Sequence, residues 1–321
     1  MRILLWHVHG SWTTSFVQGG HSYVVPVLPG RGPDGLGLAR TYPWPGTVAE
    51  LGPDELRDAG VDVVVLQRPH ELELTERWLG RRPGRDLPAV YVEHNTPRGD
   101  VPLTRHPVAD RPELLLVHVT HFNRLFWDAG NTPTRVVAHG IVDPGDRYTG
   151  ELARIAVAVN EPVRRGRVTG TDLLAGFTRA APVDAFGIGV AALPAHTGLP
   201  RARLAVFDDL AQADLHDALA RRRVYVHLPR WTSLGLSLLE AMQLGMPVVA
   251  LAATEATEAV PAEAGVLSTD PAVLVDAARR FLADPELARA YGKRARQAGL
   301  ARHGLGRFLA DWDDVLAQVA R

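Results

Sequence analysis

Residues 224–251 read VYVHLPRWTSLGLSLLEAMQLGMPVVAL, and this stretch decides the fold prediction. It contains an apolar strand pattern at 224–229, a helical pattern at 235–244 that Gly245 closes, and a second apolar strand pattern at 246–251. Strands that are apolar throughout are typical of parallel sheets that helices cover on both faces. The stretch therefore predicts a strand–helix–strand unit of a parallel sheet.

The same alternation runs through the whole chain. A first series of strands is expected at 2–8, 23–28, 61–67, 89–94, 114–120 and 134–140, and a second at 154–160, 183–189, 203–208, 224–229 and 246–251. Helices are expected at 71–80, 121–129, 170–179, 211–221 and 235–244, and throughout 271–320. The pattern predicts an α/β protein with two Rossmann-like domains facing a cleft, with ligands beyond the carboxyl ends of the strands.

Glycine and proline cluster at 138–151, between the two series of strands. The 321 residues are also enough for two domains of ordinary size. We therefore expect an N-terminal domain over 1–143 and a C-terminal domain over 144–304. The terminal helix, 305–321, is expected to pack back toward the N-terminal domain.

The composition excludes several kinds of ligand, metal site and location. The net charge is −1, which argues against nucleic acid as the main ligand, and the absence of cysteine excludes disulfides and thiolate metal sites. The first residues lack the apolar core of a signal peptide, and no apolar run is long enough to span a bilayer, so a cytoplasmic protein is expected. The only lysine is Lys293, so any phosphate contact must use arginine.

Polar residues follow the predicted strands of the first domain. They are His9, Gly10, Gln67, Arg68, His94, Asn95 and Thr120. Because the carboxyl ends of parallel strands meet at one edge of a sheet, these residues predict a polar, histidine-rich surface suited to hydroxyl-bearing ligands.

A metal site is an alternative interpretation of the first strand. His7 and His9 would share one face of a strand over 2–8, as paired histidines do in several metal hydrolases. No acidic cluster nearby completes a coordination sphere. We therefore expect no metal.

The second domain opens with a strand followed by VNEPVRRGRVTGTDLL, residues 159–174. Arg164, Arg165 and Arg167 precede a helix expected from about Thr171. Guanidinium groups beside a helix N-terminus bind phosphate oxygens well, which predicts a diphosphate site. A solvated run of charges is the alternative.

A second helix start lies within the opening stretch. The backbone N–H groups of Leu234, Gly235 and Leu236 would be unpaired donors there, and Glu240 follows about one turn into the helix. A carboxylate in that position can accept hydrogen bonds from two ribose hydroxyls. The alternative is a glutamate on the helix surface.

The segment LGLSLLEAMQLGMPVVAL resembles the C-terminal motif of retaining GT-B glycosyltransferases of the family-4-like group, the glycosyl transferases group 1. The usual form is a glutamate, then F-G-L, then L-E-A-M-x-x-G-x-P-V-V-A. Residues 234–236 stand for F-G-L, and 239–249 match the remainder. Thr232 replaces the first glutamate. Residues 161–166 are similar to the diphosphate loop of that family, with Arg165 in place of a lysine.

The resemblance implies the GT-B fold and a retaining transferase that uses a nucleotide-diphosphate sugar and a hydroxyl acceptor, without metal or cofactor. Glu240 would bind ribose, and Arg164, Arg165 and the helix-start N–H groups would stabilise the leaving diphosphate. The implied donor-binding residues are Asn160, Glu161, Arg164, Arg165, Thr232, Ser233, Leu234, Gly235, Leu236 and Glu240. His94 is implied as a catalytic group beside Arg164 and Arg165, on the acceptor side.

Two other functions remain open at this point. A nucleotide-sugar epimerase or hydrolase of the same fold would turn over the donor without an acceptor. A catalytically weak homologue would bind a nucleotide sugar without turning it over. Thr232, which replaces the first glutamate of the motif, makes this alternative relevant. Residues 76–88 combine Trp78 and Leu79 with several arginines, so peripheral contact with the inner membrane face is a further hypothesis.

Overall fold

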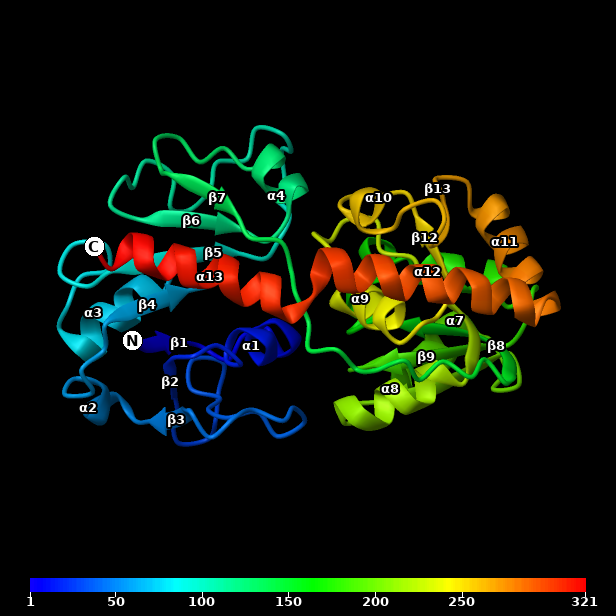
Figure 1. The fold of residues 1–321 in the computed structure, drawn as a ribbon, viewed down its shortest axis with the longest axis horizontal. Helices are drawn as coiled ribbons and strands as arrows, with labels where there is room; N and C mark the ends of the chain where they lie inside the picture. Colours follow the sequence, from blue (N-terminus) through cyan, green and yellow to red (C-terminus); the bar gives the residue numbers. More distant parts are fainter. The chain divides into compact units, whose positions relative to one another are not determined.

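The computed structural model describes residues 1–321 and contains two separate parallel β-sheets. The chain divides into two compact units, one formed by Met1–Val142 with Leu305–Arg321 and the other by Asp143–Gly304. We call them the N-terminal unit and the C-terminal unit. Each unit holds one sheet with helices around it (Figure 1). The predicted α/β class with two Rossmann-like sheets is confirmed.

The N-terminal unit is built on a seven-stranded sheet in which every pair of neighbours is parallel. In spatial order its strands are β3 (Val48–Leu51), β2 (Ser22–Pro26), β1 (Arg2–Leu5), β4 (Val63–Leu66), β5 (Ala89–Glu93), β6 (Leu115–His118) and β7 (Thr134–Val136). Its helices are α1 (Gly10–Phe16), α2 (Pro53–Leu56), α3 (Glu71–Leu79), α4 (His121–Phe126) and α13 (Leu305–Val319). All four residues of β4 are fully buried, because helices cover both faces of this sheet.

The C-terminal unit is built on a six-stranded parallel sheet. In spatial order its strands are β10 (Leu204–Asp208), β9 (Val183–Gly187), β8 (Leu152–Ala158), β11 (Arg222–His227), β12 (Val248–Leu251) and β13 (Gly265–Ser268). Its α-helices are α5 (Pro162–Arg165), α6 (Leu174–Phe177), α7 (Leu193–Thr197), α8 (Gln212–Ala220), α9 (Leu236–Gln243), α10 (Ala256–Ala259), α11 (Pro271–Ala283) and α12 (Pro285–His303). Three short 3-10 turns are η1 (Gly166–Thr169), η2 (Thr171–Leu173) and η3 (Val190–Ala192).

Both sheets reverse their strand order at one point. The chain runs outward from β1 to β3 and then returns to β4 on the other side of β1, and it does the same from β8 to β10 and back to β11. In open parallel sheets, the crevice at the carboxyl ends of the two strands that flank this reversal is the usual ligand position. Ligands are therefore expected beside the segments that follow β1 and β4 in one unit, and β8 and β11 in the other.

The structure differs from the sequence prediction at short elements. Strands β3 and β13 were not predicted, because each is a short edge strand with a partly exposed pattern and no continuous apolar run. Helix α1, with the sequence GSWTTSF, was also missed, since serine, threonine and glycine are poor helix formers. The predicted strand 2–8 ends at Leu5, and the predicted helix 170–179 is broken into η2 and α6.

Tertiary packing explains why α1 forms. The Trp12 ring meets Trp312 of α13 edge-on, with centroids 5.6 Å apart, and Phe16 meets the same indole at 5.0 Å. Trp12, Phe16 and Trp312 are all essentially buried. Burial of this aromatic cluster offsets the weak helix propensity of the α1 sequence.

Residues 76–88, proposed for membrane contact, pack their two large apolar side chains on the N-terminal unit. Trp78 stacks on the buried Trp6, with ring centroids 6.0 Å apart, and Leu79 is buried in the same core. Arg81 donates to the Val61 carbonyl oxygen at 2.8 Å, and Arg82 pairs with Asp86. The apolar side chains thus pack on the core, and membrane contact through the exposed arginines of this segment stays a prediction. None of the helices in the structure combines the length and the apolar character that a bilayer span requires.

Candidate functional site

Helix α9 begins without a side-chain cap. Its N-cap residue, Gly235, is extended, and no hydrogen bond from the N–H group of Gly235 or Leu236 to a protein acceptor is found. The start of α9 lies directly after the loop that follows β11, one of the two strands at the reversal of the sheet. Free N–H groups at the start of a helix favour an anion, so this point can bind phosphate.

Gly235 is required by the close approach of α9 to the end of β11. A Cβ atom at this position would overlap the ring of His227, the last residue of β11. Burial lowers the pKa of His227 to about 4, so this imidazole is neutral at pH 7. The start of α9 therefore lies against the end of β11, and the neutral His227 ring adds no charge there.

Glu240 is buried rather than on the helix surface. The residue is only 5% exposed, which excludes the alternative of a solvated surface glutamate. Its Oε1 accepts a hydrogen bond from Gln212 Nε2 at 3.1 Å, and His216 Nε2 lies 3.7 Å from the same oxygen. A carboxylate offers about four acceptor positions, so Glu240 keeps capacity for two hydroxyl donors.

Asn160 and Glu161 are held by the fold in a way that the sequence did not indicate. The Asn160 side-chain oxygen accepts a hydrogen bond from the Ile188 backbone N–H at 2.9 Å, so it fixes the loop after β9. Glu161 adopts a left-handed conformation with φ of 52° and forms an ion pair with Arg164. This ion pair lowers the pKa of Glu161. Both residues shape the loop, and their contact with a donor stays a prediction.

The arginines after β8 are partly engaged by carboxylates. Arg164 is two-thirds exposed and pairs with Glu161, whereas Arg165 is half-buried. Arg167 contacts Asp172 at 2.8 Å. Arg164 and Arg165 both belong to α5. The carboxylates of Glu161 and Asp172 offset part of the positive charge that this segment presents to a ligand.

Arg230 is a residue that the sequence analysis did not single out. Its guanidinium binds Asp172 at 2.6 Å, which lowers the pKa of Asp172, and its backbone N–H donates to the Val168 carbonyl oxygen at 2.8 Å. Gly170, with φ of 76°, lies so close to the Leu228 carbonyl oxygen that a side chain there would overlap it. These contacts join the loops after β8 and β11 into one surface at the reversal of the sheet.

Thr232 lies in the loop between β11 and α9 and is half-buried. Ser233 and Leu234 beside it are buried, and the Ser233 carbonyl oxygen accepts from the Glu255 N–H at 3.4 Å. Leu236, the first residue of α9, is half-buried. The predicted donor residues of 232–240 thus all belong to one continuous loop–helix segment.

His9 and His94 come together at the carboxyl edge of the N-terminal sheet. Their ring centroids are 4.0 Å apart, and Trp12 meets the His94 ring edge-on at 5.0 Å. Burial and then the nearby Arg68 charge lower the pKa of His9 to about 4, and burial is the main cause that holds the pKa of His94 well below its usual value. Both imidazoles are neutral at pH 7, when each carries one donor and one acceptor nitrogen.

His7 does not join this pair, which corrects the expectation of a shared strand face. The strand ends at Leu5, and His9 is the N-cap of α1. The His7 Nδ1 atom lies 3.0 Å from the Gly37 carbonyl oxygen, and its ring packs on Trp44 at 4.6 Å. No group of three or more histidine, aspartate or glutamate side chains in residues 1–321 could hold a metal ion.

Two of the expected acceptor-side residues use their polar groups inside the unit. Gln67 Nε2 donates to the Trp6 carbonyl oxygen at 2.8 Å, which ties β4 to the end of β1. The Thr120 hydroxyl accepts from the Asn123 N–H at 3.0 Å and caps α4. These contacts stabilise the fold, and an acceptor role for the two side chains stays a prediction.

The remaining acceptor-side residues are also constrained. Arg68 donates to the buried Glu71 at 2.6 Å and pairs with Asp34 at 3.0 Å, so two carboxylates offset its charge. Asn95 is exposed, and its carbonyl oxygen accepts from the Trp127 indole at 2.8 Å. Gly10 lies against the Tyr42 ring, where a Cβ would come within 2.6 Å of a ring carbon.

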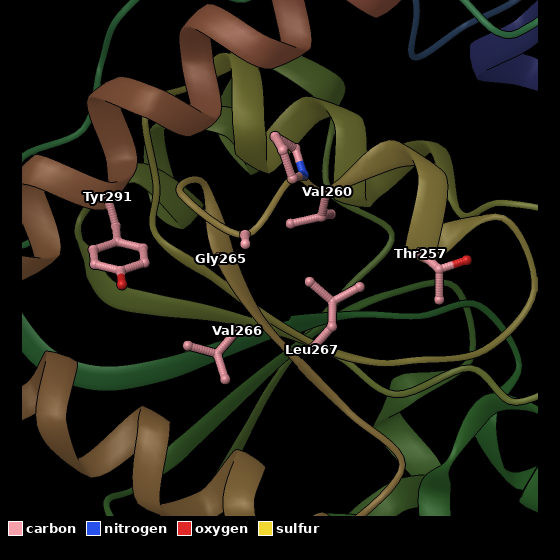
Figure 2. A pocket seen from close by; sticks show the side chains of 8 residues that line it. Thr257, Val260, Gly265, Val266, Leu267 and Tyr291 are labelled. Carbon is pink, nitrogen blue, oxygen red and sulfur yellow. The ribbon is translucent and has the colours of Figure 1, made fainter.

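A cavity of about 470 Å³ lies elsewhere in the C-terminal unit, beside the edge strand β13 (Figure 2). Its lining residues are Thr257, Val260, Pro261, Ala262, Gly265, Val266, Leu267 and Tyr291. None of these side chains carries a charge that could balance a diphosphate. We therefore place the candidate anion site at the start of α9 and not in this cavity.

Comparison with known families supports the assignment made from the motif. Residues 197–298 match the family described as Glycosyl transferases group 1. The matched range contains β11, α9 and Glu240. The segment that carries the motif thus matches the family that the motif resembles, and that family is one of glycosyltransferases. No curated protein matches the chain.

Solved structures share the fold over the whole chain. Anabaena HepE in complex with UDP-glucose is 15% identical, with a TM-score of 0.71, over 99% of this chain and 100% of that one. Sucrose-phosphate synthase from Thermosynechococcus elongatus is 15% identical, with a TM-score of 0.69, over 99% and 98%. AviGT4, a glycosyltransferase involved in avilamycin A biosynthesis, is 16% identical, with a TM-score of 0.63, over 100% and 98%. At these identities the likeness establishes the fold, which is GT-B.

Proposed function

We propose, from the glycosyl transferases group 1 match of residues 197–298, that this protein is a retaining glycosyltransferase. It moves a sugar from a nucleotide-diphosphate sugar to a hydroxyl acceptor and needs no metal ion. The observation that carries the proposal is the pairing, on one helix, of an uncapped N-terminus with the buried carboxylate of Glu240. The first binds an anion and the second binds a pair of hydroxyls, and a nucleoside diphosphate contains both groups.

The donor lies with its diphosphate at the start of α9. The N–H groups of Gly235 and Leu236, together with Arg165 and Arg164, stabilise the negative charge that develops on the leaving diphosphate. Glu240 accepts from the ribose hydroxyls. Because HepE is described in complex with UDP-glucose, a UDP-sugar is the first donor to test.

The transfer breaks the bond between the sugar C1 and the diphosphate oxygen, and its electron pair stays with the diphosphate. The acceptor oxygen forms the new bond to C1 on the same face, which retains the anomeric configuration. The acceptor hydroxyl passes its proton to the leaving phosphate oxygen. No protein nucleophile is needed in this scheme, and arginine and backbone N–H groups supply the stabilisation of charge.

The acceptor is a hydroxyl compound that meets the N-terminal unit near His94. Neutral His94 and His9 can each exchange one hydrogen bond with a hydroxyl group, whereas protonated imidazoles could only donate. His94 therefore orients the acceptor hydroxyl. The exposed Asn95 beside it supplies a further polar contact.

A catalytically weak nucleotide-sugar-binding homologue is the second candidate. Two observations favour it: the Asn160 side chain holds Ile188, and Arg164 is paired with Glu161. Less positive charge then reaches the leaving group. Slow or absent transfer, with nucleotide binding intact, would be the result under this candidate.

A thermal-shift screen over UDP, GDP, dTDP and ADP sugars tests nucleotide binding. A ligand at 100 times its Kd stabilises the folded protein by about 2.7 kcal/mol, so a true donor raises the melting temperature clearly. Release of nucleoside diphosphate with and without hydroxyl acceptors then separates the functions. Acceptor-dependent release supports the transferase, and acceptor-independent release supports a hydrolase or epimerase. A protein that no nucleotide stabilises would contradict the proposal.

A further inference from the structure

Helix α8 places two polar side chains against the carboxylate of Glu240. Gln212 and His216 are four residues apart on α8, so they lie on the same face of the helix one turn from each other. Gln212 is in the first turn, and His216 follows in the second. Both side chains reach Oε1 of Glu240, Gln212 at 3.1 Å and His216 at 3.7 Å.

The His216 contact is incomplete in the structure. The His216 side chain is 8% exposed, and its Nε2 atom has no hydrogen-bond partner. At 3.7 Å from Glu240 the separation exceeds a normal hydrogen bond. A buried ring nitrogen that lacks a partner is unfavourable, and a small shift of the carboxylate toward His216 would satisfy it.

The two oxygens of the Glu240 carboxylate differ in their contacts. Oε1 faces α8, and the only hydrogen bond that Glu240 accepts from a side chain is the one from Gln212. Oε2 has no such donor within the unit. A ligand with two adjacent hydroxyl groups can then bind the remaining acceptor positions, while α8 prevents the carboxylate from rotating.

We propose that Gln212 and His216 are positioning residues that set the specificity of Glu240 for ribose over 2′-deoxyribose. They act through Glu240 and do not touch the ligand. Gln212 fixes the carboxylate before the nucleotide arrives, and His216 Nε2 donates a second hydrogen bond to the carboxylate once the ribose hydroxyls are bound. The inference rests on the proposed function, since it requires Glu240 to bind the ribose of the nucleotide.

The test compares ribonucleotides with their 2′-deoxy forms. We would measure Kd for UDP, GDP and ADP and for 2′-deoxy-UDP, 2′-deoxy-GDP and 2′-deoxy-ADP by calorimetry, and use the ratio for the base that binds most tightly. The wild-type protein should prefer the ribonucleotide about tenfold, as expected for a hydrogen bond to a charged group. The double variant Gln212→Leu with His216→Phe should lower that ratio to about twofold or less.

The affinity for the deoxynucleotide separates a positioning role from a structural one. It should stay within about twofold in the double variant, because the diphosphate and base contacts are unchanged. Asp214→Asn, an exposed residue on the same helix, is the matched control and should leave the ratio unchanged. His216→Gln, which keeps a side-chain donor, should recover part of the ratio in a background with Gln212 intact.

The measured affinities separate a failure of the α8 contacts from a failure of nucleotide binding itself. A ratio that stays near tenfold in the double variant overturns the inference, while nucleotide binding by the wild type still supports the proposed function. Equal losses of affinity for both nucleotide forms also overturn it, because they indicate general damage to the unit. If the wild type binds none of the nucleotides, the proposed function itself fails, and the inference fails with it.

Discussion

The two units place polar residues at equivalent ends of equivalent sheets, but they use them differently. In the N-terminal unit, Gln67 and Thr120 make hydrogen bonds that hold the fold together. In the C-terminal unit, the start of α9 is uncapped, and Glu240 is held on one side only. Polar groups at a strand end are therefore stronger candidates for ligand binding where the fold leaves their hydrogen bonds unmade, as at the start of α9.

The two units also differ in the histidines whose pKa is lowered by burial. In the N-terminal unit, burial lowers the pKa of His7, His9, His94 and His118, and in the C-terminal unit it lowers the pKa of His227. A folded-state pKa below the unfolded value means that the unfolded state binds more protons. The contribution of these histidines to the free energy of unfolding is then constant above about pH 6.5 and falls as the pH drops from there toward about 4.

The largest expected effect is this acid sensitivity of the N-terminal unit. A pKa of about 4 at His9 corresponds to a loss of roughly 3 kcal/mol between pH 6.5 and pH 4. Six of the seven tryptophans lie in the N-terminal unit, so tryptophan fluorescence in urea at pH 7.5 and pH 4.5 reports its unfolding. His118→Leu should weaken the pH dependence. Hydrogen exchange that shows the C-terminal unit opening first in acid would contradict the comparison.

Glu240→Gln should produce the next largest effect. The substitution removes the charge that accepts the ribose hydroxyls, and we expect nucleotide affinity to fall by about 1.5–3 kcal/mol, or roughly 10- to 100-fold. Calorimetric titration of the preferred nucleoside diphosphate measures it. Glu258→Gln, at an exposed position of α10, is the control. Unchanged affinity in the Glu240 variant would remove Glu240 from the proposed site.

Thr120→Ala tests the structural side of the comparison. Loss of the cap of α4 should cost about 1 kcal/mol of unfolding free energy and leave nucleotide affinity unaltered. Urea unfolding together with the nucleotide titration measures both quantities. Thr257→Ala, an exposed threonine of the C-terminal unit, serves as the reference. A change in nucleotide affinity without a change in stability would show that Thr120 has a ligand-binding role after all.

Thr232→Glu should have the smallest effect on nucleotide affinity, within about twofold. Thr232 offers one hydroxyl, whereas a carboxylate accepts from two sugar hydroxyls, so the substitution should alter sugar preference or turnover. Transfer rates with several sugars on the same nucleotide measure this, and Thr232→Ser keeps the hydroxyl as a control. Parallel losses for nucleotide and sugar would place Thr232 outside the sugar contact.

Several features of the fold could be predicted because they depend on neighbours in the chain. The apolar runs at β11 and β12 and the helix between them follow from local periodicity, and α9 begins within one residue of the prediction. Edge strands β3 and β13 escaped prediction, since a partly exposed strand has no continuous apolar run. Helix α1 escaped because the packing of Trp12 on Trp312, and not its own sequence, stabilises it.

The candidate site likewise has features that the sequence predicted and contacts that only the tertiary structure shows. By itself the sequence determined two parallel α/β sheets, the family motif and the position of Glu240 on its helix, because these are patterns of spacing along one segment. Only the tertiary structure decided that Gln212 binds Glu240, that His9 lies against His94 and that Asn160 is held by Ile188. Such pairs join residues that are distant in sequence, and the order of strands in each sheet determines which of them meet.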